Sequence, residues 1–397
     1  MPRPTLEMNQ LLADPFGLLS RLRAQGPLAD MPEAGIVAIL GYEDARSLLG
    51  DRRLHANFVD FLTTFGVSSG TFYEWMASSP LNREGAEHQR WRGLMMRTFT
   101  PRSVERLRPF LKQAAHTLIE AFAASGACEF VHDFADVFPS LGLCELIGVP
   151  AADRGRFAVW ANTIGLGFSP MVAMHIAEVD AALAELLAYA SELAAARRAE
   201  PRDDLISRIA AAAAEDGWTD DEVRGAIAGL VFAGHDTTKN QLGWMVFALS
   251  ERPDLWDAVG RGTLAPAPMV EELLRYRSSA SGIGRTASEP VEVSGCPFAA
   301  GQQMLISVWS ANHDERVFPR AQTLDPAQSL ETPHLAFGHG AHYCLGNALA
   351  RAELEEALAA LSARIECPAV SEGATWRPPV GLNGPTCLPL TFKPRQS

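Results

Sequence analysis

A single cysteine, Cys344, lies in a glycine-rich turn of a kind that can hold a metal. The turn spans 337–346, and leucines at close to helical spacing follow it. Cys344 therefore lies at or just before a predicted helix N-terminus, where free N–H groups and the helix dipole favour a thiolate, a soft metal ligand. The ring of Phe337 can shield the sulfur. The glycines that we expect to take positive φ and to admit a flat cofactor are Gly338, Gly340 and Gly346.

A second candidate site lies in the middle of the longest predicted helix. Thr219-Asp220-Asp221-Glu222 is a capping box, which predicts a helix from Asp220 to about Ser250. Its middle, Ala233-Gly234-His235-Asp236-Thr237-Thr238, combines a glycine with poor helix formers, a break in local rules that often marks function. A threonine hydroxyl bonded to the i−4 carbonyl would open a groove for a diatomic molecule and a water. A kinked structural helix is the alternative.

Both stretches match motifs of the cytochrome P-450 family. The first resembles Phe-Gly-x-Gly-x-His-x-Cys-x-Gly, and the second resembles the oxygen-binding segment Ala-Gly-x-Asp-Thr-Thr. The resemblance implies a mainly α fold with small β-sheets, as a single domain over 1–397 without a fused reductase. It also implies a non-covalent haem b ligated through its iron by Cys344, in a soluble bacterial-type haem-thiolate monooxygenase. The alternative for Cys344 is an ordinary buried thiol.

The resemblance also implies roles for residues far from the cysteine. His88 and Arg92, four apart on one predicted helix face, would contact the haem propionates with Arg285 and His342, although a solvated polar face explains the first two equally simply. Phe337, Gly338 and Gly346 would complete the cofactor site.

Glu272 and Arg275 would form a buried pair behind the turn at 337–346, called the cysteine loop below. Gln328 stands where an arginine usually completes this pair, so Arg316 and Arg320 are alternative third partners.

The substrate pocket is predicted from composition and resemblance together. Its candidate lining residues are Leu230, Ala233, Gly234 and Ile283, with the aromatic stretch 58–76, the join 164–174 and the segments 279–283 and 383–386. We expect the stretch 57–87 to be an irregular loop. A loop this long is usually functional, and the alternative is an aromatic cluster that only packs the loop down. The pocket suggests a small apolar organic substrate that is hydroxylated or dealkylated.

The composition of the whole chain excludes several classes. The 397 residues carry a net charge of −13, which argues against nucleic acid and anionic membranes as partners. Six scattered cysteines without a Cys-x-x-Cys motif are typical of the reducing cytoplasm. The N-terminus shows no signal peptide, and no apolar run of about 20 residues spans a bilayer. We therefore expect a cytoplasmic monomer.

The electron donor and the reaction class follow from the same motifs. No Gly-x-Gly-x-x-Gly follows a predicted strand, so the resemblance implies electrons from a separate ferredoxin or flavodoxin and its reductase. The donor would dock near Arg90, Arg97, Arg102 and Arg351, for which a solvated basic patch is the alternative. A peroxide-driven peroxygenase or a haem gas or redox sensor is the alternative to a monooxygenase. Asp236 and Thr237 favour the monooxygenase, because only dioxygen activation needs both groups to deliver protons.

Overall fold

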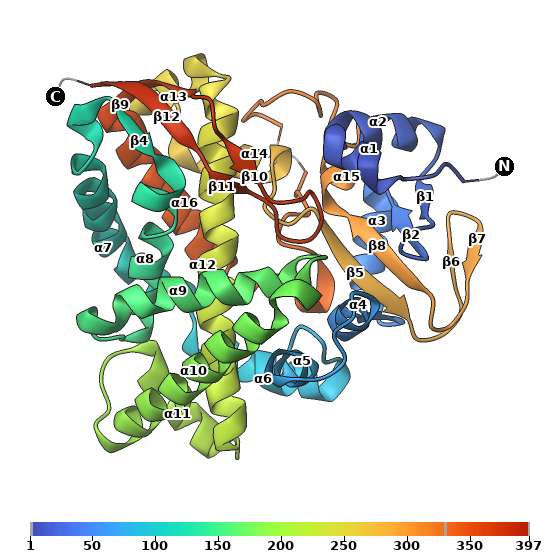
Figure 1. Ribbon diagram of the computed structural model, residues 1–397, viewed down its shortest axis with the longest axis horizontal. Helices are drawn as coiled ribbons and strands as arrows, with labels where there is room; N and C mark the ends of the chain where they lie inside the picture. Colours follow the sequence, from blue (N-terminus) through green and yellow to red (C-terminus); the bar gives the residue numbers. More distant parts are fainter. Residues whose placement is uncertain (1–2, 329–331, 396–397) are drawn as a thin grey trace.

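The longest helix, α12 (Asp220–Ser250), runs through the middle of the molecule, with other helices packed around it (Figure 1). This computed structural model describes residues 3–328 and 332–395. The predicted capping box is present, because Thr219 Oγ1 accepts the Glu222 N–H at 3.2 Å and Glu222 Oε2 accepts the Thr219 N–H at 2.8 Å. Both bonds satisfy orphan donors at the helix start, so the chain enters α12 at the predicted residue.

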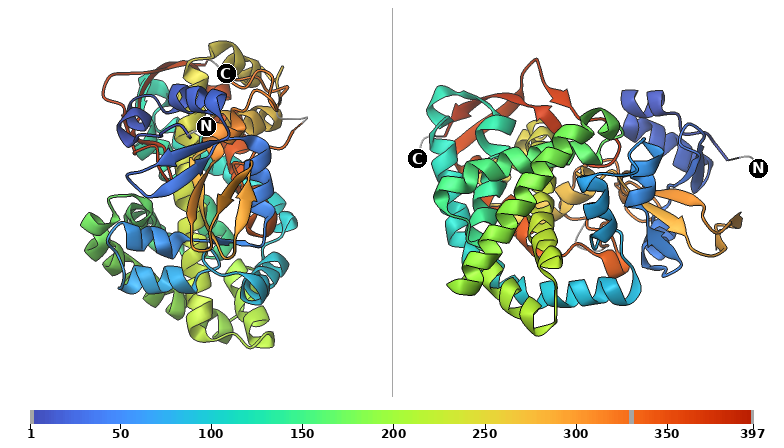
Figure 2. Two further views of the ribbon diagram at one scale, coloured as in Figure 1. Left: turned by 90° about the vertical axis from the view of Figure 1, so that its right-hand side faces the viewer. Right: turned by 60° about the horizontal axis from the view of Figure 1, so that its bottom comes forward.

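The helices that surround α12 include α8, α9, α10 and α16, and Figure 2 shows α9 and α10 crossing it. The larger helices, in chain order, are α6 (Gly85–Thr98), α7 (Pro101–Glu120), α8 (Phe138–Ile147), α9 (Arg154–Gly165), α10 (Val172–Ala199), α11 (Leu205–Glu215), α14 (Pro266–Tyr276) and α16 (Asn347–Arg364). The shorter ones are α1 (Met8–Ala13), α2 (Pro15–Gln25), α3 (Tyr42–Gly50), α4 (Phe58–Thr64), α5 (Thr71–Ser78), α13 (Pro253–Gly260) and α15 (Val308–Asn312), with η1 (Ala123–Ser125), η2 (Val131–Ala135), η3 (Ala151–Asp153), η4 (Leu166–Phe168) and η5 (Gly340–His342).

A five-stranded sheet lies to one side of the helices, next to α1 and α2 (Figure 1). Its strand order is β1 (Leu28–Met31), β2 (Ile36–Ile39), β8 (Gln303–Ser307), β5 (Gly282–Ala287) and β3 (Leu54–Ala56), with β2 and β8 parallel and the other pairs antiparallel. Arg285 on β5 lies opposite Ala56 on β3 and Met304 on β8. Because side chains alternate along a strand, Ile283 and Arg285 share one face of the sheet.

The remaining strands form small sheets near the C-terminal part of the chain and at one edge of the molecule. They are β4 (Ala127–Glu129), β9 (Ile365–Val370) and β12 (Pro389–Pro394) in one sheet, β6 (Val291–Val293) with β7 (Cys296–Phe298), and β10 (Thr375–Trp376) with β11 (Pro385–Cys387). The observed class is therefore mainly α with small β-sheets, as predicted. Within the described residues, none of the helices has the length and apolar character needed to cross a membrane.

The stretch 57–87, predicted to be irregular, instead contains helices α4 and α5, so that prediction is wrong. Its own sequence signals are weak, and contacts with distant segments hold it. The Phe72 N–H donates to Asp180 Oδ1 at 2.7 Å, and the Phe168 ring stacks on Phe232 of α12 with centroids 4.2 Å apart. Phe168 also contacts the rings of Phe58 and Phe72. The aromatic residues of this stretch thus join α4 and α5 to η4 and α12.

Candidate functional site

One cavity of about 440 Å³ brings together most of the residues that the sequence singled out. It is bordered by α6, α12, α16, β5 and the cysteine loop. The predicted cofactor residues that line it are His88, Arg92, Arg285, Phe337, Gly338, His342, Cys344 and Gly346, and the predicted pocket residues are Leu230, Ala233, Gly234 and Ile283. Of the two predicted catalytic residues, Thr237 lines it as well. These residues come from segments up to about 250 positions apart, so the fold assembles the site.

Helical periodicity explains which residues of α12 reach this cavity. Leu230, Ala233, Thr237 and Gln241 are three or four positions apart and lie on one face, and all of them line the cavity. Asp236 lies on another face and is not among the lining residues. The Thr237 hydroxyl therefore lines the cavity, whereas the Asp236 carboxylate lies outside it.

The Thr237 hydroxyl donates to the Ala233 carbonyl at 2.7 Å, as predicted for a threonine bonded to its i−4 carbonyl. Helix α12 nevertheless continues unbroken through this residue. Because the hydroxyl proton is committed to Ala233, the lone pairs of Oγ1 remain free to accept a hydrogen bond from a molecule in the cavity. Thr237 can thus hold a water without an open groove in the helix.

Asp236 is fully buried and forms a bidentate ion pair with Arg377, at 2.7 and 2.8 Å. Arg377 follows β10, and its side chain is 16% exposed. Gly165 of α9 leaves the space beside Asp236, since a Cβ at this glycine would lie 3.1 Å from the carboxylate. Arg377 is a residue that the sequence reasoning missed, because it lies 141 positions from its partner.

The cysteine loop has the backbone that its glycines predict, with one exception. Gly338 and Gly340 take φ of 70° and 73°, and the Cys344 N–H donates to the Phe337 carbonyl at 2.9 Å. A Cβ at Gly340 would lie 2.6 Å from the Leu49 carbonyl oxygen, so only glycine fits there. Gly346 takes φ of −79° as the N-cap of α16, so the prediction of a positive φ is wrong for this residue.

The pKa of the Cys344 thiol is raised from its ordinary value, chiefly because the sulfur is buried. The Gly346 N–H and the guanidinium groups of Arg92 and Arg351 offset part of this rise. Burial thus opposes the thiolate that the helix start favours. A metal cation would have to supply the remaining stabilisation of the negative sulfur.

The four residues predicted to hold the propionates gather at one end of the cavity. The rings of His88 and His342 have centroids 4.2 Å apart, and Arg285 is buried with Nη1 donating to the Gly284 carbonyl at 2.9 Å. Burial, with the charges of His342 and Arg92, lowers the pKa of His88 to about 4, so His88 is neutral at physiological pH. The cluster thus presents neutral His88 and two arginines with His342.

Glu84, a residue that sequence reasoning missed, lies behind this cluster. Its Oε1 accepts from His342 Nε2 at 2.9 Å and from the Ala56 N–H at 2.8 Å. Burial alone would raise the pKa of Glu84, but these hydrogen bonds and the charges of His342 and Arg285 lower it to about 2. Glu84 is therefore a carboxylate, and His342 Nε2 must carry the proton of the shared hydrogen bond.

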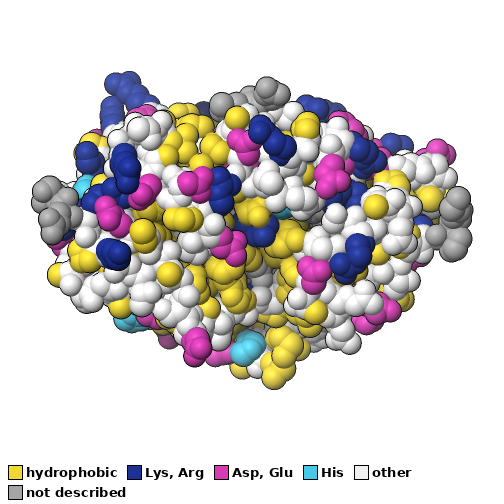
Figure 3. Space-filling view, turned by 90° about the horizontal axis from the view of Figure 1, so that it is seen from above, with side chains coloured by type: hydrophobic (Ala, Val, Ile, Leu, Met, Phe, Trp, Pro, Cys, Tyr) yellow, Lys and Arg dark blue, Asp and Glu magenta, His cyan; other side chains and the backbone are white. Residues whose placement is uncertain are grey.

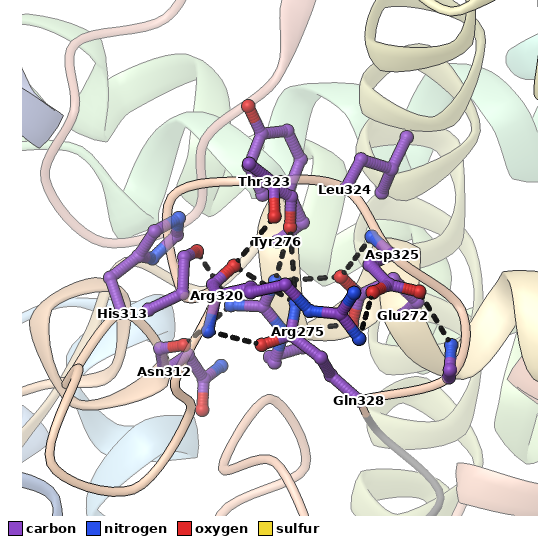
Figure 4. A network of polar contacts seen from close by, with 12 residues as sticks. Glu272, Arg275, Tyr276, Asn312, His313, Arg320, Thr323, Leu324, Asp325 and Gln328 are labelled. Atoms are coloured by element: carbon purple, nitrogen blue, oxygen red, sulfur yellow. Dashed lines mark hydrogen bonds and ion pairs between the residues drawn. The ribbon is translucent and has the colours of Figure 1, made fainter.

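Glu272 and Arg275 form the predicted buried pair, with no exposed surface on either side chain. Figure 4 shows Arg275 between Glu272 and the loop that carries Asn312 and Thr323. Arg275 Nε and Nη2 donate to Glu272 at 2.8 and 2.7 Å, while Nη1 donates to the carbonyls of Asn312 and Ala321 and Nη2 donates to that of Thr323, at 2.9 to 3.0 Å. All five guanidinium N–H groups are thus used.

Gln328, one of the three candidates for the third partner of the Glu272–Arg275 pair, contributes to this network by bonding to the backbone of the loop. Gln328 Oε1 accepts the Arg320 N–H at 2.8 Å, and Gln328 Nε2 donates to the Arg320 carbonyl at 2.9 Å. The side chains of Arg316 and Arg320 pair with Asp314 and Asp325 instead. Gln328 therefore shapes the loop around Arg275, and the Asp325 N–H donates to Glu272 Oε1 at 2.7 Å.

A second carboxyl group that the sequence reasoning missed lines the cavity itself. Glu353 on α16 is completely buried, and neither of its carboxyl oxygens meets hydrogen-bond geometry with a described protein group. Burial raises its pKa well above the usual range, although nearby Thr238 offsets part of this rise. Burial therefore favours the protonated form of Glu353 in the wall, and its helical spacing from Leu349 and Ala350 was the available signal.

The distal part of the cavity is lined mainly by apolar and aromatic side chains. Trp75, Trp91, Phe168 and Phe232 line it with Leu230. In the predicted segments 279–283 and 164–174, Ser279, Ala280 and Phe168 reach it, whereas Met171 and Met174 are exposed on the surface. The C-terminal turn joins β10 to β11 and spans residues 377–384. Leu382 of this turn reaches the cavity, while the predicted residues 383–386 do not.

The arginines predicted to receive an electron donor are mostly paired. Arg90 pairs with Glu222, Arg97 with Asp216, and Arg351 with Glu271, whereas Arg102 forms no ion pair with any described residue. Basic and acidic side chains are likewise interspersed on the opposite face, which Figure 3 shows from above, away from α6. The predicted basic patch is thus largely neutralised by carboxylates.

The donor set of the cavity fits a haem. Of the cysteines in the described ranges, only Cys344 lines the cavity, and it offers a soft sulfur ligand for iron. Arg92, Arg285 and His342 offer donors for two carboxylates, and the apolar walls suit a flat, hydrophobic ring. The residues that would hold a haem therefore all line a single cavity.

Comparisons with known proteins also indicate a haem protein. A protein-family model for cytochrome P-450 matches residues 170–261 and 267–369. The chain is 34% identical over 359 residues to luteothin monooxygenase of Streptomyces thioluteus, covering 89% of this chain and 87% of that protein. It is 32% identical to the cytochrome P-450 monooxygenase PikC of Streptomyces venezuelae, covering 98% and 95%. A solved cytochrome P-450 from Chondromyces apiculatus superposes with a TM-score of 0.89 at 28% identity, covering 100% of both chains.

Proposed function

The chain belongs to the cytochrome P-450 family, and we propose that it hydroxylates or oxidatively dealkylates an apolar organic molecule of moderate size. Its relatives are monooxygenases and hydroxylases, and the chain is accordingly a haem monooxygenase. We further propose a non-covalent haem b with Cys344 as the iron ligand. Electrons come, in this proposal, from a separate ferredoxin or flavodoxin and its reductase.

One observation carries the proposal. Cys344, Thr237 and the four predicted propionate ligands, called the propionate cluster (His88, Arg92, Arg285 and His342), all line the same cavity. The bound haem supplies the activation of dioxygen, and a thiolate ligand favours cleavage of the O–O bond. The protein supplies the ligand, holds the propionates through Arg92, Arg285, His88 and His342, and excludes water with apolar walls.

Proton delivery is assigned to groups on α12. Thr237 Oγ1 can accept a hydrogen bond from a water in the cavity, because its own proton is bonded to Ala233. Asp236 connects this helix to solvent through the partly exposed Arg377. Asp236 must leave Arg377, or act through water, to pass a proton toward Thr237.

The substrate class follows from the aromatic and aliphatic lining of the distal cavity. A cytoplasmic monomer is supported by the net charge of −13, which favours solubility, and by the free cysteines, which suit a reducing compartment. A screen of apolar organic molecules for a binding-induced change in the absorption spectrum would identify candidates.

The spectrum of the reduced protein under carbon monoxide tests the central assignment. We expect the red-shifted Soret band of thiolate ligation in the wild-type protein and its loss in Cys344→Ser. The matched controls are Cys128→Ser, Cys296→Ser, Cys367→Ser and Cys387→Ser, which should retain the band because these cysteines do not line the cavity. A Cys344→Ser variant that keeps the band would contradict the proposed ligand.

A further inference from the structure

Glu84 separates the haem cavity from a second cavity at the surface. The surface cavity, of about 450 Å³, is lined by Glu84 together with His55, Glu87 and Thr286. His342 lines the inner cavity, so the hydrogen bond between Glu84 and His342 crosses the wall between the two. Glu84 is thus within reach of solvent on one side and bound to a predicted propionate ligand on the other.

The side chain of Glu84 does not serve its own helix. Glu84 is the N-cap residue of α6, a position whose side chain commonly accepts from the first helical N–H groups, but it makes no such bond here. Its Oε1 instead accepts from Ala56 of β3 and from His342 of η5. The carboxylate therefore ties together three segments that are distant in the sequence.

These segments are the ones that carry the propionate cluster. Ala56 lies directly opposite Arg285 in the sheet, and His88 and Arg92 lie on α6 one and two turns after Glu84. The ring of His342 is held at one edge by Glu84 and at its face by His88, 4.2 Å away. Glu84 therefore contacts the cluster directly at His342 and lies beside the elements that carry its other members.

We propose that Glu84 is a positioning residue that fixes His342, and with it the β3–α6–η5 junction, for binding of the haem propionates. This inference rests on the haem site proposed above. Removal of a residue that hydrogen-bonds to a ligating side chain and orients it typically weakens binding about tenfold to a hundredfold. Glu84 would act through His342 and would not touch the cofactor itself.

Release of haem from the holoprotein to excess apomyoglobin tests the proposal. We expect about tenfold faster release from Glu84→Ala and a smaller increase from Glu84→Gln, which keeps an acceptor oxygen but loses the charge. The matched control is Glu87→Ala. Glu87 lines the same surface cavity and pairs with Arg83, so its removal should leave the release rate unchanged.

A double-mutant cycle distinguishes positioning of His342 from a general effect on the fold. If Glu84 acts through His342, Glu84→Ala should add nothing to the release rate of His342→Ala. The propionate bending bands in the resonance Raman spectrum should shift in Glu84→Ala and in His342→Ala, but not in Glu87→Ala.

Wild-type release from both Glu84 variants, or additive effects in the double mutant, would overturn the inference. Glu84→Gln keeps the test available if the alanine variant fails to fold. None of these measurements needs a substrate or an electron donor. A failed haem assignment would show separately, as a carbon monoxide spectrum that does not depend on Cys344.

Discussion

Replacing Arg275 by lysine removes hydrogen bonds while it keeps the charge, so it measures what the guanidinium does behind the cysteine loop. Arg275 uses five N–H groups on Glu272 and on the carbonyls of Asn312, Ala321 and Thr323. An ammonium group has three donors, so at least two of these bonds are lost. Each buried acceptor left without its partner costs about 1–3 kcal/mol, which gives a destabilisation of about 2–6 kcal/mol for Arg275→Lys.

Urea unfolding of the purified holoprotein, followed by circular dichroism, gives the change in the free energy of unfolding. The haem content per protein, measured by absorption, should fall in parallel, because the loop anchored by Arg275 precedes the cysteine loop in the sequence. Arg275→Ala should cost more still, since it leaves the fully buried Glu272 without this cation.

The matched control is Arg320→Lys. Arg320 belongs to the same loop and pairs with Asp325, but its side chain is 64% exposed, so this substitution should cost no more than about 1 kcal/mol. If Arg275→Lys were as stable as Arg320→Lys and bound as much haem, the loop would not depend on the guanidinium geometry. The interpretation of the network would then be refuted.

Three further predictions concern the site and its surroundings. Thr237→Ala should still bind haem but divert most reducing equivalents to hydrogen peroxide, because it lacks the hydroxyl that holds a water; product at the wild-type yield per electron would contradict this role. Arg102→Glu should slow electron transfer at low salt more than Arg97→Glu, because Arg97 is already paired with Asp216; equal effects in stopped-flow measurements would contradict the assignment. The third prediction concerns the contribution of Glu271 to the free energy of unfolding. Burial alone would raise the pKa of Glu271, but His334 and Arg351 lower it to about 2. The ionised carboxylate therefore contributes about 3 kcal/mol above about pH 4.5, and this contribution declines toward pH 2. The destabilisation in Glu271→Gln should therefore shrink as the pH falls below about 4.5, and urea unfolding that showed a constant difference would contradict it.

The local parts of the fold and site were predictable from the sequence because their determinants are local. The capping box at Thr219 and Glu222 specifies the start of α12 within four residues, and the glycines at 338 and 340 specify the cysteine loop. The Glu272–Arg275 pair lies within one helical turn. In each of these cases, residues close in the sequence determine the geometry.

The unpredicted parts depend on contacts between distant segments. Glu84 meets His342 across 258 positions, and Arg377 meets Asp236 across 141, so no spacing rule could connect them. The helices α4 and α5 are held by contacts such as that of Phe72 with Asp180, which tertiary packing alone supplies. Burial likewise decides the pKa of Cys344, and burial cannot be read from a motif.

The packing of the C-terminal turn on α12 has a consequence for how the protein is made. A Cβ at Gly243 would lie 2.3 Å from Pro385, and one at Gly384 would lie 2.5 Å from Asn240, so the turn fits α12 in a single register. This turn brings Arg377 to the fully buried Asp236. Chains are synthesised from the N-terminus, so in a nascent chain that has not reached Arg377 the Asp236 carboxylate on α12 lacks its ion-pair partner. The native environment of α12 is therefore completed only after the chain has been synthesised through the turn that carries Arg377.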